Sequence, residues 1–484
     1  MPEQGPVRSA QRPSERARRA DPARLAAYTL LRAVASGAYA NLALPVILRR
    51  RRLGGRDAAF ATELAYGTLR MQGRYDPILA TTARRPTDAL DPAVLDTLRL
   101  GAHQMLAMRV PAHAAVSETV ALARTVNGVG PAGLVNAVLR RVGERHLDGW
   151  LAEVAPPSMP LVQRLAVEQS HPVWVVEALR AALLGHARAT RATVDAELTA
   201  LLQADNLPAA VTLAGRPGLA DVDELVRAGA EPGRLAPTAA VLPHGDPGAL
   251  PAVREARAAV QDEGSQLVAL ALLAADVPAV GRAERWLDLC AGPGGKAGLL
   301  AGAAASGQAW LVAAEVSEHR AQLLRATLAP AVDRAPGRIE VRVGDGREVG
   351  ALEPGRYDRV LVDAPCSGLG ALRRRPEARW RRTPADCQTL VPLQRALLDA
   401  ALDATRPGGV VAYATCTPHL PETRFVVVDV VKARHDVEVL DARPAVELAS
   451  AGRATELGAG PQVQLWPHVH GTDAMFLALL RRRG

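Results

Sequence analysis

The sequence predicts a multidomain chain with an all-α domain first, a small α+β module in the middle and an α/β domain at the end. Apolar residues recur at helical spacing up to about residue 141, without an evident strand. Strand and helix segments mix between about 180 and 250, and strands alternate with helices from about 253 onward. The length of 484 residues agrees with this division, because it suits about three domains.

The first part of the chain has a tail and a helical domain. Residues 1–20 are basic, rich in Pro and Arg, and lack periodicity, so we expect a disordered tail. The all-α domain is expected over 21–148, and its first helix opens with Asp21 as the N-cap and Pro22 at the first position. Further helical segments are expected at Phe60–Leu69, Val94–Met105, Val116–Val126 and Leu134–Val142.

The middle part, 149–250, is expected to hold a linker helix and a small α+β module. The helix lies around Trp174–Leu184, and a short strand follows at Val211–Leu213. A second helix fits Asp221–Arg227, after which connections rich in Pro and Gly lead to about Pro251.

The last part, 251–484, alternates strands and helices, which predicts a doubly wound parallel sheet of the Rossmann-like class. In such sheets ligands bind at the carboxyl ends of the strands. The expected strands are Trp286–Leu289, Trp310–Ala314, Ile339–Val343, Val360–Val362, Val410–Ala414, Val437–Leu440 and Met475–Leu480, with helices at 297–304, 317–328, 386–405 and 422–434.

Composition excludes several classes of protein. Hydrophobic residues make up 49% and charged residues 22%, as in soluble globular proteins. The longest apolar runs fall far short of the ~20 residues that span a bilayer. The four cysteines form no C-x-x-C pair, which argues against a disulfide scaffold or a zinc ribbon. We therefore expect a cytoplasmic monomer that binds neither a membrane nor a metal.

The net charge of +8 points modestly to a polyanionic partner. Of the 58 basic residues only Lys296 and Lys432 are lysine, which leaves 56 arginines. A lysine retained in a glycine-rich loop under this bias suggests that a compact ammonium group is needed at position 296.

Three consecutive strand ends carry groups that suit a nucleoside. A glycine-rich turn runs from Asp288 to Lys296 and lets the backbone approach a ligand, although it does not fit the P-loop pattern. Glu315, at the end of the next strand, can accept hydrogen bonds from ribose hydroxyls. Asp345 follows the third strand and is placed to meet an adenine edge. Together these residues favour an adenosine-containing cofactor.

Two further strand ends carry thiols. Cys366 follows Asp363-Ala-Pro after the fourth strand, and Cys416 follows Tyr413-Ala-Thr after the fifth. Either cysteine alone would most often be a buried core residue. Two thiols at neighbouring strand ends, beside an acid and Lys296, favour a chemical role.

These motifs resemble those of the Nop2/Sun family of S-adenosylmethionine-dependent RNA cytosine-C5 methyltransferases. Asp363–Cys366 and Thr415–Cys416 match its paired-cysteine signature, and Cys290–Lys296 matches its cofactor loop. Arg374–Trp380 resembles the segment after the first cysteine, and Asp473–Phe476 resembles the family's last strand. The resemblance implies a class I methyltransferase domain over 251–484.

The N-terminal domain resembles the NusB type of helical RNA-binding domain. The matching stretches are Glu63–Gly67, Leu98–Ala102 and Val135–Arg140. The combination points to the bacterial Fmu-type branch that methylates a cytosine of 16S ribosomal RNA, with cytosine 967 as the family's type target. It implies that the helical domain and the 149–250 module both contact folded RNA, before the small subunit is fully assembled.

The sequence departs from the family pattern at several positions. Gly292 stands where Ala is usual, Ala297 where Thr is common, and Thr417 where Ser is usual. Pro421–Arg424 replaces an acidic Pro-Glu-Glu-Asn. None of these changes removes a reacting group.

The resemblance assigns Cys416 as the nucleophile that attacks C6 of the cytosine and Cys366 as the thiol that resolves the adduct. Asp363 would pair with N3 of the base, and Lys296 would favour the thiolate. Cys387 is expected to be structural. The cofactor set is Cys290, Ala291, Gly292, Pro293, Gly294, Gly295, Lys296, Glu315, Arg320, Asp345 and Asp363. The expected RNA contacts are Arg373, Arg374, Arg375, Arg379, Trp380, Arg381 and Arg382.

Other functions remain open from the sequence. The same chemistry would serve a transfer-RNA or large-subunit RNA methyltransferase. A non-catalytic RNA-binding assembly factor would not need both thiols, Asp363 and Lys296. A DNA cytosine methyltransferase would use the Pro-Cys thiol and would not need Cys416, and a nicotinamide dehydrogenase would explain Glu315 but neither thiol.

Overall fold

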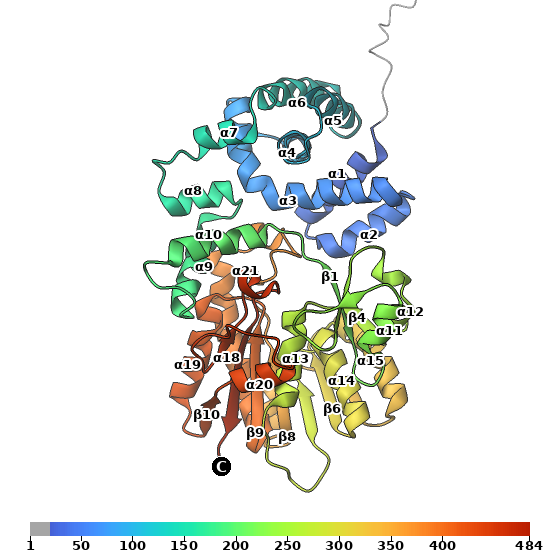
Figure 1. Cartoon of the computed structure of the whole chain (residues 1–484), viewed down its shortest axis with the longest axis vertical. Helices are drawn as coiled ribbons and strands as arrows, with labels where there is room; N and C mark the ends of the chain where they lie inside the picture. Colours follow the sequence, from blue (N-terminus) through green and yellow to red (C-terminus); the bar gives the residue numbers. More distant parts are fainter. Residues whose placement is uncertain (1–19) are drawn as a thin grey trace, which may run out of the picture. The chain divides into compact units, whose positions relative to one another are not determined.

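The computed structural model describes residues 20–484, so the predicted tail falls almost wholly outside the described residues. The described chain divides into two compact units (Figure 1). The first holds residues 20–173 and Arg375–Glu377, and the second holds Trp174–Arg374 and Ala378–Gly484. The domain boundaries expected at 148 and 250 remain predictions.

The regular structure of the first unit is helical, with no strand among its described residues. The predicted start of its first helix is confirmed, because the Asp21 carboxylate accepts a hydrogen bond from the Arg24 N–H and Pro22 follows it. The third and fourth helices approach closely at Gly67, where a Cβ atom would lie 2.1 Å from Nε2 of His103. The helices are α1 (Pro22–Ala35), α2 (Ala40–Arg50), α3 (Gly55–Ala83), α4 (Pro92–Leu106), α5 (Ala112–Val126), α6 (Val129–Val142), α7 (Leu147–Val154) and α8 (Leu161–Glu168).

The second unit begins with two helices and a small antiparallel sheet. The strand expected at Val211–Leu213 is present, and the sheet has the order β2-β3-β1-β4. Its fourth strand comes after residue 250, so the sheet continues past the expected edge of the module. The elements are α9 (Val173–Gly185), α10 (Val194–Asp205), β1 (Val211–Gly215), α11 (Val222–Arg227), β2 (Glu231–Pro232), β3 (Ala239–Leu242), α12 (Pro251–Arg254) and β4 (Ala258–Val260).

The large sheet of the second unit has the order β10-β12-β9-β8-β5-β6-β7, with β11 paired to β12. Strands β5 to β9 pair in parallel, as predicted, but β12 runs antiparallel to β9 and β10. The expectation of an all-parallel sheet is therefore wrong at its last strand, because a buried apolar strand has the same pattern in either direction. The strands are β5 (Arg285–Asp288), β6 (Trp310–Glu315), β7 (Ile339–Val343), β8 (Tyr357–Asp363), β9 (Thr405–Thr415), β10 (Val437–Leu440), β11 (Val463–Gln464) and β12 (Phe476–Arg482).

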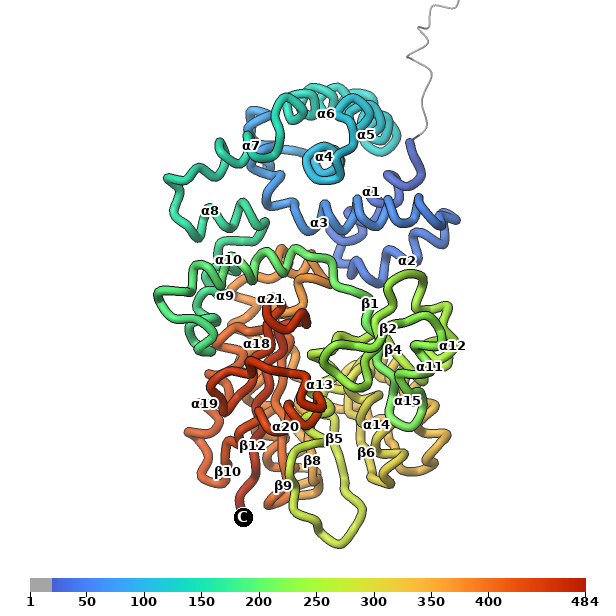
Figure 2. Tube along the Cα trace, viewed as in Figure 1, coloured from blue at the N-terminus to red at the C-terminus, as the bar shows by residue number. Residues whose placement is uncertain are grey.

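Helices cover both faces of this sheet, and the trace in Figure 2 follows the chain between the layers. Alternate strand residues face opposite sides: Leu361 packs with the core under α13, whereas Val360 and Val362 pack with the core under α18. One face carries α13 (Glu263–Ala274), α14 (Gly295–Gly307), α15 (Glu318–Arg334) and α20 (Arg443–Ala449), and the other carries α16 (Val349–Leu352), α18 (Pro384–Ala404) and α19 (Arg424–Ala433). The predicted order of an all-α part and an α/β part is thus confirmed.

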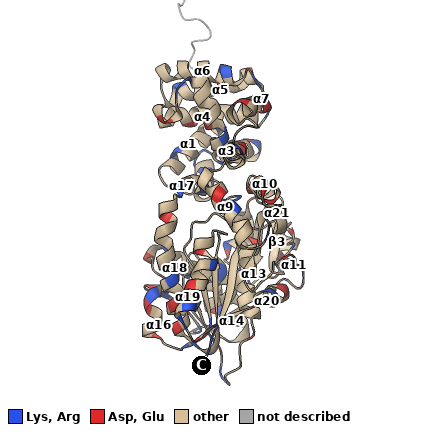
Figure 3. Ribbon diagram, turned by 90° about the vertical axis from the view of Figure 1, so that its left-hand side faces the viewer, with Lys and Arg blue, Asp and Glu red and all other residues tan. Residues whose placement is uncertain are grey.

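Charges of both signs lie side by side around α16, α18 and α19 (Figure 3). Arg434, which follows α19, pairs with Asp403 at 2.8 Å and with Asp436 at 2.7 Å. Arg395 of α18 pairs with Asp429 of α19. These arginines are therefore committed to partners in the same chain. None of the helices in residues 20–484 combines the length and apolarity that crossing a bilayer requires.

Candidate active site

The glycine-rich loop lies between β5 and α14, at the carboxyl edge of the sheet. Gly294 has a φ of +116°, and a Cβ atom there would lie 2.5 Å from Cγ2 of Thr327, so this position needs glycine. At Gly292 a Cβ atom would lie 2.3 Å from Oε2 of Glu315. The departure from the family's usual Ala at 292 therefore goes with a close approach of the loop to Glu315.

Glu315 ends β6 and is only 2% exposed. Its carboxylate accepts hydrogen bonds from the N–H groups of Gly292, at 3.2 Å, and Ser317, at 3.0 Å. Arg320 pairs with Glu315 at 3.4 Å and also donates to the carbonyl of Gly292. Glu315 and Arg320 thus hold the glycine-rich loop as well as flanking it.

Asp345 follows β7 and is half-buried. Its carboxylate accepts hydrogen bonds from the backbone N–H and the guanidinium of Arg347, both at 3.0 Å, and these bonds lower its pKa. Because β5, β6 and β7 are neighbours in the sheet, the loop, Glu315 and Asp345 share one edge. Backbone groups and two carboxylate acceptors there suit the ribose hydroxyls and exocyclic amine of an adenosine group. The residues present therefore fit S-adenosylmethionine.

Lys296 lies in the first turn of α14 and is buried, with 8% of its side chain exposed. Its Nζ donates to Oδ2 of Asp363 at 2.9 Å. Burial alone would lower the pKa of Lys296, but the charge of Asp363 outweighs it and raises this pKa. Lys296 is thus a buried, charged group at the end of β8 and not a solvated surface ammonium.

Asp288, at the end of β5, is only 1% exposed. Burial and the charge of Asp363 raise the pKa of Asp288 to about 8, although Lys296 acts in the opposite direction. This carboxyl could not be singled out from the sequence, because its burial depends on the packing around the strand end.

The two predicted thiols meet. Strands β8 and β9 are parallel neighbours, and the Sγ atoms of Cys366 and Cys416 lie 3.4 Å apart. Hydrogen bonding from Cys366 lowers the pKa of Cys416, and the charge of Lys296 acts in the same direction, against burial and Asp363. The pKa of Cys366 is raised well above its usual range, because this thiol donates the bond to Cys416, is buried and lies beside the charge of Cys416. The pair therefore favours a thiolate on Cys416 and a thiol on Cys366.

The remaining cysteines have other surroundings. Burial raises the pKa of Cys290 beyond its usual range, and that of Cys387 to about 11. Both cysteines are free. The structural role expected for Cys387 stays a prediction.

Three arginines of the run after Cys366 have hydrogen-bond partners in the second unit. Nε of Arg374 donates to the buried Asp473 at 3.0 Å, and a guanidinium nitrogen of Arg373 donates to the carbonyl of Gly471 at 2.5 Å. Arg379 is fully buried and donates to Oδ1 of Asn206 at 2.9 Å. Arg374 and Arg379 therefore stabilise contacts within the second unit.

The remaining members of the run differ in exposure. Arg375 is exposed and belongs to the first unit, where its guanidinium lies 5.7 Å from the ring centre of Tyr39. Trp380, Arg381 and Arg382 are half-buried. The RNA-binding role of the whole run stays a prediction, and Arg375 is the member with the most accessible side chain.

Comparisons with known proteins match both parts of the chain. The model of the NusB family matches residues 21–144, and that of the 16S rRNA methyltransferase RsmB/F family matches residues 278–481. The crystal structure of PH0851 superposes with a TM-score of 0.76 at 20% identity, covering 96% of this chain and 99% of that one, which supports the fold.

Relatives match over nearly the whole length. A Mycobacterium tuberculosis protein named only as a methyltransferase is 52% identical over 470 residues, covering 96% of this chain and 98% of the relative. The ribosomal RNA small subunit methyltransferase B of Erwinia tasmaniensis is 31% identical over 467 residues, covering 94% and 97%. That of Pseudomonas putida is 33% identical over 421 residues, covering 85% and 89%. The resemblance inferred from the motifs is confirmed, and the chain belongs to the ribosomal RNA small subunit methyltransferase B family.

Proposed function

We propose that this methyltransferase transfers a methyl group to C5 of a cytosine in 16S ribosomal RNA, with Cys416 forming a transient bond to C6. The observation that carries this proposal is the pair of thiols 3.4 Å apart at neighbouring strand ends, with the pKa of Cys416 lowered by its partner. The cofactor is S-adenosylmethionine, which supplies an electrophilic methyl group when bound.

Cytosine C5 is a weak nucleophile, so the base must first be activated. The thiolate of Cys416 adds to C6, which gives C5 enamine character and leaves negative charge on the N3 side of the ring. The Lys296 ammonium, 2.9 Å from the one-third exposed carboxylate of Asp363, supplies a proton through that carboxylate to N3, and the proton returns when the S–C6 bond breaks. These three residues come from the ends of β9, β8 and the start of α14.

The second half of the reaction needs a base that removes the C5 proton. In the proposed mechanism this base is the thiolate of Cys366. Before the reaction, bonding to Cys416 and the charge of Cys416 keep the Cys366 thiol protonated. Once Cys416 is bonded to C6 it is an uncharged thioether, so these two effects disappear, and the pKa of Cys366 falls toward the level that burial and the charge of Glu422 still set. Cys366 then releases its proton to water and takes the C5 proton, the S–C6 bond breaks, and Cys416 leaves as a thiolate.

The proposed substrate is 16S ribosomal RNA before the small subunit is fully assembled, modified in the cytoplasm by a monomer. A stacked cytosine is not accessible to Cys416, so the target must be single-stranded or flipped out. The names of the small-subunit methyltransferase B relatives support this choice of RNA.

Separate substitution of the two thiols tests the mechanism. Cys416→Ala should abolish methylation and leave no covalent RNA adduct. Cys366→Ala should form the bond to C6 and stop afterwards, trapping methylated RNA in a band that survives denaturing gels and disappears on nuclease treatment. An adduct in Cys416→Ala and none in Cys366→Ala would reverse the two roles.

The RNA assignment has its own test. Bisulfite mapping of ribosomal RNA from cells that lack the protein should show one 16S cytosine without its methyl mark. Complementation with the intact gene, but not with the Cys416→Ala gene, should restore the mark. Loss of a mark in transfer RNA or large-subunit RNA instead would move the protein to another substrate.

A further inference from the structure

A buried carboxylate connects the two loops that carry the thiols. Glu422 closes the short 3-10 helix η5 (Leu420–Glu422) and is 0% exposed. Its Oε1 accepts hydrogen bonds from the backbone N–H of Ser367, at 2.7 Å, and from Nε2 of Gln394, at 3.2 Å. Its Oε2 accepts a hydrogen bond from Nδ1 of His419 at 3.0 Å. Both carboxylate oxygens are therefore in use.

These bonds reach both neighbours of Cys366. Ser367 follows Cys366 directly, and Nε2 of Gln394 also donates to the carbonyl of Pro365 at 2.8 Å. The Ser367 hydroxyl in turn bonds the hydroxyl of Thr417, next to Cys416, at 3.0 Å. The loop that carries Cys366 is thus held at both ends to the segment that follows Cys416.

The peptide carbonyl of Glu422 fixes the carboxylate to the sheet itself. It accepts a hydrogen bond from the hydroxyl of Tyr413 at 2.8 Å, and Tyr413 is a fully buried residue of β9. β9 is the strand that leads to Cys416. Movement of Glu422 is therefore coupled to the strand of one thiol and, through Ser367, to the loop of the other.

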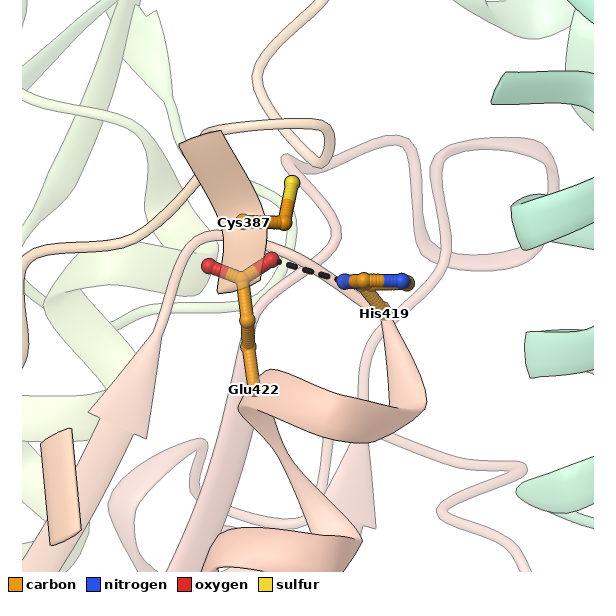
Figure 4. Close-up of side chains that lie close together, drawn as sticks. All are labelled: Cys387, His419 and Glu422. Atoms are coloured by element: carbon orange, nitrogen blue, oxygen red, sulfur yellow. Dashed lines mark hydrogen bonds and ion pairs between the residues drawn. The ribbon is translucent and has the colours of Figure 1, made fainter. Parts of the chain in front are cut away.

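A metal site is the competing explanation of this cluster. The ligand atoms of Cys387, His419 and Glu422 lie within 4.8 Å of one another (Figure 4). However, each oxygen of Glu422 already has a hydrogen-bond donor, and burial raises the pKa of Cys387 to about 11, so its sulfur keeps a proton. The hydrogen bonds thus satisfy the carboxylate without an ion.

We propose that Glu422 is a positioning residue for the methyl transfer, which holds Cys366 against Cys416 through the N–H of Ser367. The inference rests on the proposed function, since it concerns the thiol assigned to adduct release. Removing the carboxylate leaves a buried N–H without an acceptor, and a small shift of the loop breaks the 3.4 Å contact between the sulfurs. Cys416, which directly follows β9, keeps its place at the end of that strand and can still attack.

Glu422→Ala should therefore show the defect of Cys366→Ala in a milder form, with slow release of the covalent adduct. We expect kcat to fall at least about tenfold, the factor that one charge-assisted hydrogen bond represents, with KM for RNA little changed. The fraction of enzyme in the covalent RNA band should rise above the wild-type level. Glu422→Gln keeps an acceptor oxygen for Ser367, so it should return most of the activity and reduce the band.

A matched control comes from the same unit. Glu263 is also a buried carboxylate that accepts backbone N–H bonds, from Leu235 at 2.5 Å and Ala236 at 2.8 Å. Glu263→Ala should lower thermal stability as Glu422→Ala does, but should leave the adduct fraction at the wild-type level. This comparison separates loss of buried hydrogen bonds in general from misplacement of Cys366.

The outcomes are distinct. A wild-type adduct fraction in Glu422→Ala, while Cys366→Ala traps RNA, overturns the positioning role and leaves the proposed function intact. No adduct in Cys366→Ala overturns the proposed function instead. If Glu422→Ala does not fold, Gln394→Leu, which breaks the bridge to Pro365, must raise the adduct fraction for the proposal to stand. Loss of wild-type activity on treatment with EDTA would favour the metal site.

Discussion

The hydrogen bond between the two sulfurs leads us to expect a specific pH dependence of thiol reactivity. This expectation can be tested without RNA or cofactor. The two sulfurs lie 3.4 Å apart, and the lowered pKa of Cys416 corresponds to a hydrogen bond in which Cys366 is the donor. Cys366→Ala removes the donor and leaves Lys296 and the burial of Cys416 in place. The pKa of Cys416 should therefore rise in this variant, and its labelling curve should move to higher pH.

The size of the shift follows from the strength of the lost bond. Hydrogen bonds to charged groups contribute about 1.5–3 kcal/mol, and a thiol is a weak donor, so the lower end applies. About 1.4 kcal/mol corresponds to one pKa unit. Below its pKa, Cys416 in the Cys366→Ala variant should thus carry about ten times less thiolate and be alkylated about ten times more slowly.

The assay is the rate of iodoacetamide labelling of each cysteine as a function of pH, followed by mass spectrometry of the separated peptides. Cys416 should react first in the wild type, and Cys366 only at high pH. Cys366→Ser restores a donor and should return part of the shift. Identical labelling midpoints for Cys416 in the wild type and in Cys366→Ala would show that the sulfur contact does not tune its ionisation.

Three further predictions concern the cofactor edge, the arginine run and the buried acid of β5. Glu315→Ala should weaken S-adenosylmethionine binding by about 1–3 kcal/mol in calorimetry, and an unchanged affinity would place the cofactor elsewhere. Neutralising Arg375 should reduce the log–log salt slope of RNA binding by about one. Neutralising Arg374 should instead lower the melting temperature, because Asp473 would stay buried without its partner. Equal salt slopes for the two variants would contradict this difference. Asp288 has a folded pKa of about 8, above the value of about 4 in an unfolded chain, so wild-type stability should fall as pH rises between these values. Asp288→Asn should therefore gain stability relative to the wild type over that range in thermal unfolding, and a constant difference would mean that the carboxyl ionises freely.

Much of the fold could be predicted from local pattern. The strands expected at Ile339–Val343 and Val437–Leu440 are β7 and β10 with the same bounds, because β-branched residues at alternate positions between turns are typical of strands. Helix α13 was missed. Its residues Glu263–Ala274 are apolar on nearly every side, so they show none of the periodicity that marks a surface helix.

The site was predictable where topology alone brings residues together. Consecutive parallel strands place their carboxyl ends at one edge, which is why Cys366 and Cys416 meet as expected. The ion pair of Arg374 with Asp473 could not be predicted, because the two residues are 99 positions apart in the chain. Glu422 was not recognised as a support for the same reason, since Ser367 lies 55 residues before it.

The order of strands in the large sheet also determines which part of the site is lost first during local unfolding. β8 and β9, which lead to the two thiols, are interior strands with hydrogen-bonded neighbours on both sides, whereas β7, which leads to Asp345, is an edge strand. An edge strand can detach by breaking one ladder, so its amide hydrogens exchange earlier than those of interior strands. During local opening the adenosine side of the site is therefore released while the sulfur pair is still held together.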